Sequence, residues 1–107
     1  MLPKVIKIAL LLCGLLVTCA QAAPSKITVA VGSDSVPFYF QGQDGQPQGL
    51  VVDLWKLWSQ KTGVVVRFKV ASFGDTLNLV RQGQADVHGG CFQSEQRAQY
   101  LDFVTPV

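Results

Sequence analysis

The sequence has little of the chemistry that metal sites, disulfide frameworks and nucleic-acid surfaces require. Its 107 residues include one histidine and three cysteines, and Lys and Arg exceed Asp and Glu by nine to seven. One histidine with so few cysteines is a poor set of metal ligands. A nearly neutral charge without basic clusters argues against nucleic-acid binding. We therefore expect no metal, no cofactor and no nucleic-acid partner.

An apolar run long enough to span a bilayer is also missing at the N-terminus. Residues 8–17 are apolar, but a spanning helix needs about 20 such residues. Lys4 and Lys7 precede this run, and the small-x-small pattern Ala20-Gln21-Ala22 follows it. This is the three-part layout of a secretory signal, so residues 1–22 are predicted to be a cleaved signal peptide and the mature protein periplasmic. An uncleaved membrane anchor is the alternative.

Cysteine use bears on the same segment. A lipid anchor at Cys19 is disfavoured, because Thr18 is bulkier than the small residue that normally precedes a lipidated cysteine. Cleavage after Ala22 removes Cys13 and Cys19 and leaves Cys91 alone. The mature chain then cannot form an internal disulfide, and its stability must come from its core.

The remaining chain alternates strand and helix patterns. A hairpin is expected at the Asp44-Gly45 pair, a helix capped by Ser72 and a short helix starting at Ser94. The other predicted elements are strands at residues 26–32, 64–70 and 85–88, a helix at 50–62 and an extended segment at 100–104. Strands that alternate with helices predict an α/β fold, a parallel sheet sandwiched between helices.

The helix expected at residues 50–62 has a clear apolar stripe. Leu50, Leu54, Leu57 and Trp58 fall on one face at spacings of three and four. Gly63 stands where a helix end favours a left-handed residue. The pattern predicts an amphipathic helix that packs through this stripe.

Residues 27–107 resemble the bacterial extracellular solute-binding proteins of family 3, the type II periplasmic binding domains for amino acids. Four pieces carry the resemblance in the family's order. They are Asp34 with Pro37-Phe38, GLVVDLWKLWSQKTG at 49–63, RQGQADV at 81–87 and SEQRAQYLDFVTPV from residue 94. The stretch from residue 86 is similar to the version fused to membrane sensors such as diguanylate cyclases. The resemblance implies two lobes with a ligand between them, so residues 23–107 are expected to form most of the first lobe of a truncated domain.

The resemblance also implies ligand-binding residues. Arg97 is expected to hold the ligand's carboxylate, because a guanidinium matches a carboxylate with two parallel hydrogen bonds. The alternative is a surface arginine paired with Glu95 or Asp102. Gly89, Gly90 and Cys91 follow the third strand, where their backbone can approach the ligand and their N–H groups can assist Arg97; the alternative is a plain turn.

Other candidates are aromatic or acidic. Phe38 and Tyr39 are expected to stack on the ligand, with the core as the alternative for one or both. Asp34 either orients the ligand or caps its loop. Trp55 and Trp58 are assigned to helix packing, His88 to a structural role, and Cys91 to a small buried apolar residue rather than a reactive thiol.

These residues favour a binding module that captures an amino acid or similar carboxylate for an ABC transporter permease or a fused sensor. No residue pattern supplies an acid or a base, so no enzyme activity is expected. Two alternatives stay open: the N-terminal part of a periplasmic enzyme on this fold (a dehydratase or a fused peptidoglycan-cleaving enzyme), and an inactive truncated fragment.

Overall fold

The computed structural model of the chain describes residues 25–105, so the predicted signal peptide lies outside the described residues. The elements follow in chain order: β1 (Lys26–Gly32), β2 (Asp34–Ser35), β3 (Tyr39–Gln41), β4 (Pro47–Gln48), α2 (Leu50–Thr62), β5 (Val65–Ala71), α3 (Phe73–Arg81), β6 (Val87–His88) and the 3₁₀ helix η2 (Arg97–Gln99). No helix within the described range has both the length and the apolar character to cross a bilayer.

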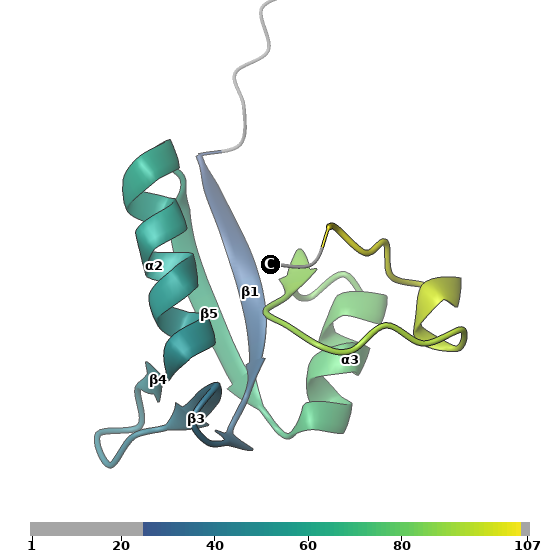
Figure 1. Cartoon of the computed structure of the whole chain (residues 1–107), viewed down its shortest axis with the longest axis horizontal. Helices are drawn as coiled ribbons and strands as arrows, with labels where there is room; N and C mark the ends of the chain where they lie inside the picture. The colour runs from purple at the N-terminus through teal and green to yellow at the C-terminus, as the bar shows by residue number, and fades with distance from the viewer. Residues whose placement is uncertain (1–24, 106–107) are drawn as a thin grey trace, which may run out of the picture.

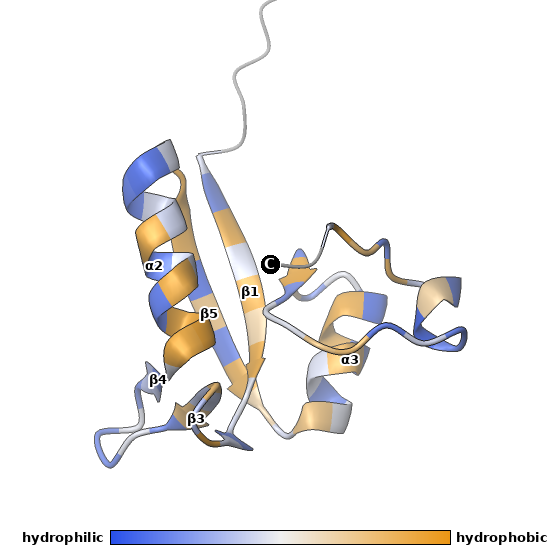
Figure 2. Cartoon of the chain, viewed as in Figure 1, coloured by the Kyte–Doolittle hydropathy of each residue, from blue (hydrophilic) through white to orange (hydrophobic). Residues whose placement is uncertain are grey.

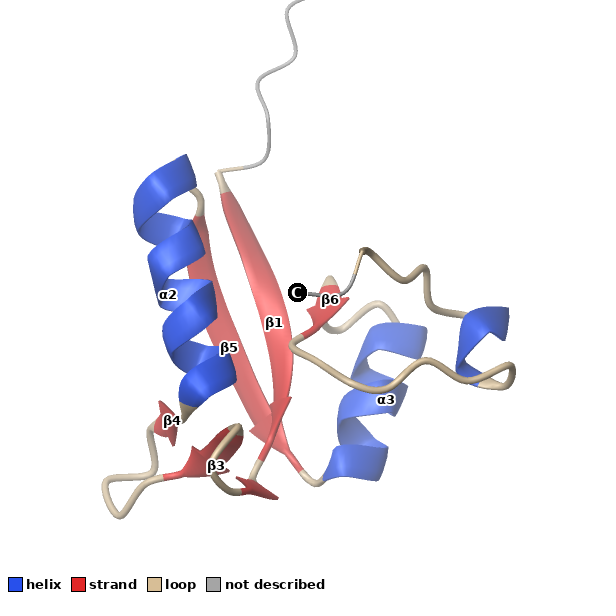
Figure 3. Ribbon diagram, viewed as in Figure 1, coloured by secondary structure: helices blue, strands red, loops and turns tan. Residues whose placement is uncertain are grey.

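A parallel sheet in the order β5-β1-β6 forms the centre of the molecule (Figure 3). β1 and β5 pair along their whole length, from Lys26 opposite Val65 to Gly32 opposite Ala71. β6 pairs only Val87 and His88 with β1. The predicted α/β fold with a parallel sheet is therefore confirmed.

The third strand is shorter than residues 85–88, and Asp86 explains where it begins. The N–H of Asp86 donates to the carbonyl of Thr28 at 2.9 Å. Its carboxylate accepts the N–H of Thr28 at 2.8 Å. The Asp86 carboxylate thus accepts the bond that a backbone carbonyl would accept in a regular strand, and the regular pairing of β6 with β1 starts one residue later, at Val87.

The two faces of the sheet are covered by different helices (Figure 1). Val29 and Val31 of β1 are fully buried with Val52 of α2 on one face. On the other face α3 brings the buried Thr76 against His88, which lies opposite Ala30 in the pairing. Alternate residues of β1 therefore serve two separate layers.

Helix α2 has the predicted bounds but packs through a different face. Gly63 ends it at φ 77° and donates its N–H to the carbonyl of Ser59 at 2.9 Å, as predicted. Val51, Val52 and Trp55 face the core. The predicted stripe is exposed instead, at 57% for Leu50, 53% for Leu54, 47% for Leu57 and 38% for Trp58. Figure 2 shows hydrophobic residues along the visible side of this helix.

A small antiparallel sheet in the order β2-β3-β4 lies beside the first turn of α2. The predicted Asp44-Gly45 turn joins β3 to β4. Gly45 has φ 79°, and the Asp44 carboxylate accepts the N–H of Gln46 at 3.0 Å. The N–H of Val51 donates to the carbonyl of Phe38 at 2.8 Å, which joins this sheet to α2.

Candidate functional site

The carboxyl ends of the parallel strands define one edge of the central sheet. β1 leads into Ser33, β5 into Ser72 and β6 into Gly89. Ligands of open parallel sheets bind beyond this edge. The segments that follow these strands therefore hold the candidate site.

Arg97 lies at the start of η2, and its backbone is positioned by a cap. Its N–H donates to Ser94 Oγ at 3.1 Å, as expected of a capping serine, although η2 begins at Arg97 with Gln96 as its N-cap residue rather than at Ser94. Its Nη1 donates to the carbonyl of Phe92 at 2.8 Å rather than to Glu95 or Asp102. Among the described residues, this bond uses one of the five guanidinium donors, and no carboxylate pairs with the Arg97 charge.

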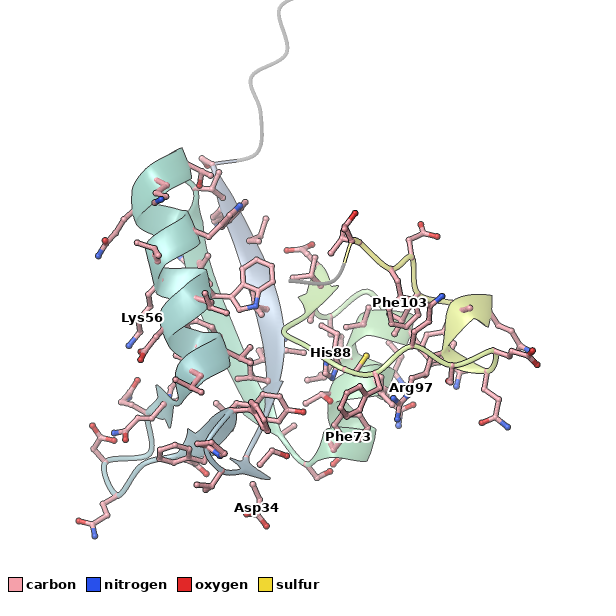
Figure 4. All side chains as sticks on the ribbon, in the orientation of Figure 1. Asp34, Lys56, Phe73, His88, Arg97 and Phe103 are labelled. Atoms are coloured by element: carbon pink, nitrogen blue, oxygen red, sulfur yellow. The ribbon has the colours of Figure 1, made fainter. Side chains whose placement is uncertain are left out.

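Phe73 is the residue that sequence reasoning missed. It is the first residue of α3, directly after the end of β5. The Arg97 guanidinium carbon lies 5.0 Å from the centroid of its ring, a cation–π distance. Figure 4 shows Phe73, Arg97 and His88 gathered on one side of the molecule. The signal that could have found Phe73 is its place immediately after a parallel strand and its capping serine.

His88 lies beneath this pair and is bonded at both ring nitrogens. Its Nε2 lies 2.8 Å from Thr76 Oγ1, and its Nδ1 lies 3.1 Å from the backbone nitrogen of Gly90. The Phe73 ring meets the imidazole edge-to-face, with centroids 5.6 Å apart. Burial, and then the nearby Arg97 charge, lower the pKa of His88 below 6.5. The lowered pKa favours the neutral form of the imidazole.

Gly89 and Gly90 use their N–H groups within the fold. Gly89 donates to the carbonyl of Ala30 at 2.7 Å, and Gly90 donates to His88. Because both N–H groups are bonded within the fold, they do not assist Arg97 in the way expected from the sequence. A Cβ on Gly89 would lie 2.6 Å from Val31 Cγ1, so packing alone requires glycine at this position.

Cys91 is half-buried and is a free thiol in the part of the chain that the structure describes. Burial raises the pKa of Cys91, and the Arg97 charge opposes this only in part. A raised pKa keeps the thiol protonated at neutral pH, whereas the thiolate is the reactive form. This chemistry agrees with the interpretation of Cys91 as an apolar side chain.

The aromatic pair after β1 is divided between core and surface. Tyr39 is 8% exposed and belongs to the core cluster, with its ring against Gly32. Phe38 is 55% exposed and remains the ring available to a ligand. The structure thus assigns Tyr39 to the alternative that sequence left open for it.

Asp34 and the tryptophans lie apart from the Arg97 group. Asp34 is exposed in β2, and Figure 4 shows it well separated from Arg97. The indole N–H of Trp55 donates to the carbonyl of Gly89 at 2.9 Å, and its ring meets Trp58 edge-to-face at 5.5 Å. Trp55 is therefore in the packing role expected for it, whereas Trp58 is 38% exposed and its ring packs on Trp55.

The remaining features are the possible metal ligands and a hollow on α2. Within residues 25–105 no three His, Cys, Asp or Glu side chains converge to hold a metal ion. A shallow hollow on the outer side of α2 is lined by Leu50, Asp53, Leu54 and Leu57. Lys56 marks the side of α2 away from the sheet in Figure 4, on the opposite side of the molecule from Arg97.

Comparison with known proteins identifies the class. Residues 27–107 match the sequence model of the bacterial extracellular solute-binding proteins, family 3, and the chain belongs to this family. Its fold is part of a periplasmic binding protein fold, and the chain spans about 38% of the length of the first solved relative described below.

Three solved structures illustrate the similarity. An ancestral arginine-binding protein bound to glutamine is 29% identical, with a TM-score of 0.71 over 79% of this chain and 38% of that protein. A histidine kinase sensor domain with similarity to periplasmic binding proteins is 29% identical, with a TM-score of 0.67 over 71% and 33%. The periplasmic domain of BvgS from B. pertussis is 25% identical, with a TM-score of 0.71 over 77% and 16%. The family resemblance inferred from sequence, including its sensor-domain members, is confirmed.

Proposed function

We propose that this chain supplies the carboxylate-binding side of a periplasmic site for an amino acid or a similar small carboxylate. The observation that carries the proposal is the placement of Arg97. Its guanidinium lies on the Phe73 ring beside the carboxyl edge of the sheet, with a carbonyl as its hydrogen-bond acceptor. A charge held this way is oriented without being neutralised, so it can meet a carboxylate with two parallel hydrogen bonds.

The related structures support a ligand of this class. Two are described as an ancestral arginine-binding protein, one bound to glutamine and one bound to arginine. We extend the shared chemistry of these ligands, the α-carboxylate, to Arg97 of this chain. The rest of the ligand would meet Phe73 and the exposed Phe38.

We also propose that the site binds its ligand without turning it over. The local chemistry supports this. Both ring nitrogens of His88 are engaged by Thr76 and Gly90, so the imidazole is not directed at a ligand. The raised pKa of Cys91 disfavours a nucleophilic thiolate.

Isothermal titration calorimetry with the twenty standard L-amino acids tests the proposal on protein purified from its native source. Loss of one partner of a charge-assisted pair in a closed site costs about 2–5 kcal/mol, so Arg97→Ala should raise Kd at least about 30-fold. Arg97→Lys keeps the charge but not the planar fork of donors, so its Kd should lie between those of wild type and Arg97→Ala.

Arg81→Ala is the matched control. The Arg81 guanidinium also lies over an aromatic ring, at 4.5 Å from the Tyr100 centroid. It ends α3, whereas Phe73 begins that helix, about 12 Å away at 1.5 Å per residue. Arg81→Ala should leave Kd unchanged. Equal losses from the two substitutions, or no binding by any amino acid, would refute the proposal.

We propose further that the domain serves a transporter or a membrane sensor. Relatives described as sensor domains support the second role, and the amino-acid-binding relatives are compatible with the first. The intact mass of the native protein, with its fractionation, separates them. A freely released binding protein supports a transporter role, and a mass that includes a membrane-embedded signalling module supports a sensor.

A further inference from the structure

One tautomer of His88 satisfies a continuous chain of hydrogen bonds. The N–H of Gly90 donates to Nδ1, so Nδ1 must carry the lone pair. The single proton of the neutral ring is then on Nε2, which donates to Thr76 Oγ1. The Thr76 hydroxyl in turn donates to the carbonyl of Phe73. The chain runs from the loop after β6 to the first turn of α3.

This chain of bonds links the groups of the candidate site. Phe73 lies at one end of it and carries the Arg97 guanidinium on its ring. Gly90 lies at the other end, one residue before Cys91 and two before Phe92. The carbonyl of Phe92 accepts the Arg97 Nη1 donor. Arg97 is therefore held between two segments that His88 joins.

The groups around the ring disfavour a second proton on it. Arg97 of η2 places a positive charge near the ring, which opposes a second one. Cys91 of the loop has a raised pKa, which favours the uncharged thiol. From α3 the ring meets the fully buried Thr76 and the Phe73 ring, and Asp75 in the same turn is exposed. Asp86 of the segment before β6 has its carboxylate engaged by the Thr28 N–H, and β1 places Ala30 opposite. A proton added to Nδ1 would also face the Gly90 N–H, donor against donor.

We propose that His88 is a positioning residue of the carboxylate site. Its neutral Nε2–H form fixes the loop after β6 to the first turn of α3, and the second proton releases this loop and weakens ligand binding. The inference rests on the proposed function, because the affinity concerned is that of a carboxylate ligand at Arg97. It adds that affinity falls on acidification.

The first test observes the imidazole directly. His88 is the only histidine of the chain, so labelling the full chain with ¹⁵N-histidine and ¹⁵N-glycine gives the two ring nitrogens of a single imidazole together with the glycine amides. Long-range ¹H–¹⁵N correlation spectra should show the Nε2–H form at pH 7.5. The titration of the ring should be matched by a shift of the Gly90 amide at the same midpoint. An Nδ1–H form, or a Gly90 amide that does not respond, overturns the proposal.

The second test measures the affinity for L-glutamine and L-arginine between pH 7.5 and 5. The wild-type Kd should rise as pH falls, by no more than about tenfold per pH unit because one proton is taken up. His88→Gln places an amide N–H where Nε2–H was and does not titrate, so its Kd should stay flat. Arg81→Ala should keep the wild-type slope.

The outcomes separate the two proposals. Equal slopes in wild type and His88→Gln overturn the role of His88, and so does affinity that rises on acidification. If none of the twenty standard amino acids binds at any pH, the proposed function fails, while the NMR experiment still decides whether His88 fixes the loop. That experiment uses the wild-type chain and does not depend on the folding of any variant.

Discussion

Gly89 and Gly90 are adjacent, yet the structure predicts opposite responses to the same substitution. A methyl group on Gly89 would lie 2.6 Å from Val31 Cγ1 and 3.1 Å from the carbonyl oxygen of Ala30. The same group on Gly90 would meet Val51 Cγ1 at 3.7 Å, an ordinary contact. Gly89→Ala therefore overpacks the fully buried side of β1, whereas Gly90→Ala does not.

The magnitude follows from two terms. Replacing glycine by alanine at a compatible position stabilises a protein by about 0.4–1 kcal/mol through the unfolded chain. This term is common to both variants. Overpacking a close-packed core costs about 1–3 kcal/mol. The shift that would relieve the clash at Gly89 would stretch its 2.7 Å hydrogen bond to Ala30. We expect Gly90→Ala to be slightly more stable than wild type. Its free energy of unfolding should exceed that of Gly89→Ala by about 1–3 kcal/mol.

Urea unfolding followed by circular dichroism measures the difference. Both variants should keep the wild-type m-value, so that the midpoints report stability alone. Equal midpoints for the two variants would show that the β6 loop adapts freely, and that packing against Val31 does not fix its path.

Two further predictions concern the core and the effect of pH. Tyr39→Ala should lower the free energy of unfolding by about 3–5 kcal/mol, as for other buried aromatic side chains. Phe38→Ala, at a site 55% exposed, should change it by no more than about 0.5 kcal/mol. Comparable losses of the two variants in urea unfolding would contradict this division between core and surface. The pKa of His88 is lowered in the folded state, so below the ordinary value of 6.5 the unfolded chain binds more protons than the folded chain. The free energy of unfolding should therefore fall as pH drops from 6.5 to the folded-state pKa, and then level off. Urea unfolding at pH 7.5 and 5.5 checks this, and His88→Gln should lose less stability between the two values than wild type.

The elements themselves were predictable because their signals are local. The valine-rich strands, the left-handed Gly63, the Asp44-Gly45 turn and the capping Ser72 each act over a few residues. Alternating strands and helices then restrict the topology to a parallel sheet. Capping and turn chemistry thus carry most of the fold.

The packing face of α2 was not predictable from spacing. Two apolar stripes follow a helical period, one containing Leu50, Leu54 and Leu57 and the other Val51, Val52 and Trp55. The second is chosen by partners distant in sequence: the β1 valines of the core, and the carbonyl of Gly89 that accepts the Trp55 indole N–H. A hydrophobic period identifies a helix, but it does not rank two competing faces.

The grouping of Phe73, His88 and Arg97 is a tertiary fact. Arg97 could be chosen from the family resemblance, but its partners are 24 and 9 residues away along the chain. Only the alignment of the ends of β5 and β6 at one edge of the sheet brings them together. Similarly, Phe38 lies in the turn before β3 and Tyr39 begins that three-residue strand, so strand alternation could not decide which of the two rings points inward.

The short segment from His88 to Gly90 is anchored from both layers of the molecule. On one face Trp55 of α2 donates to the carbonyl of Gly89, and on the other Thr76 of α3 bonds to His88. A substitution of Trp55 or Thr76 can therefore shift the backbone that supports Arg97 without touching Arg97 itself. Specificity in such a domain can change during evolution through drift on the helices, so relatives with the same residues at the sheet edge can still prefer different ligands.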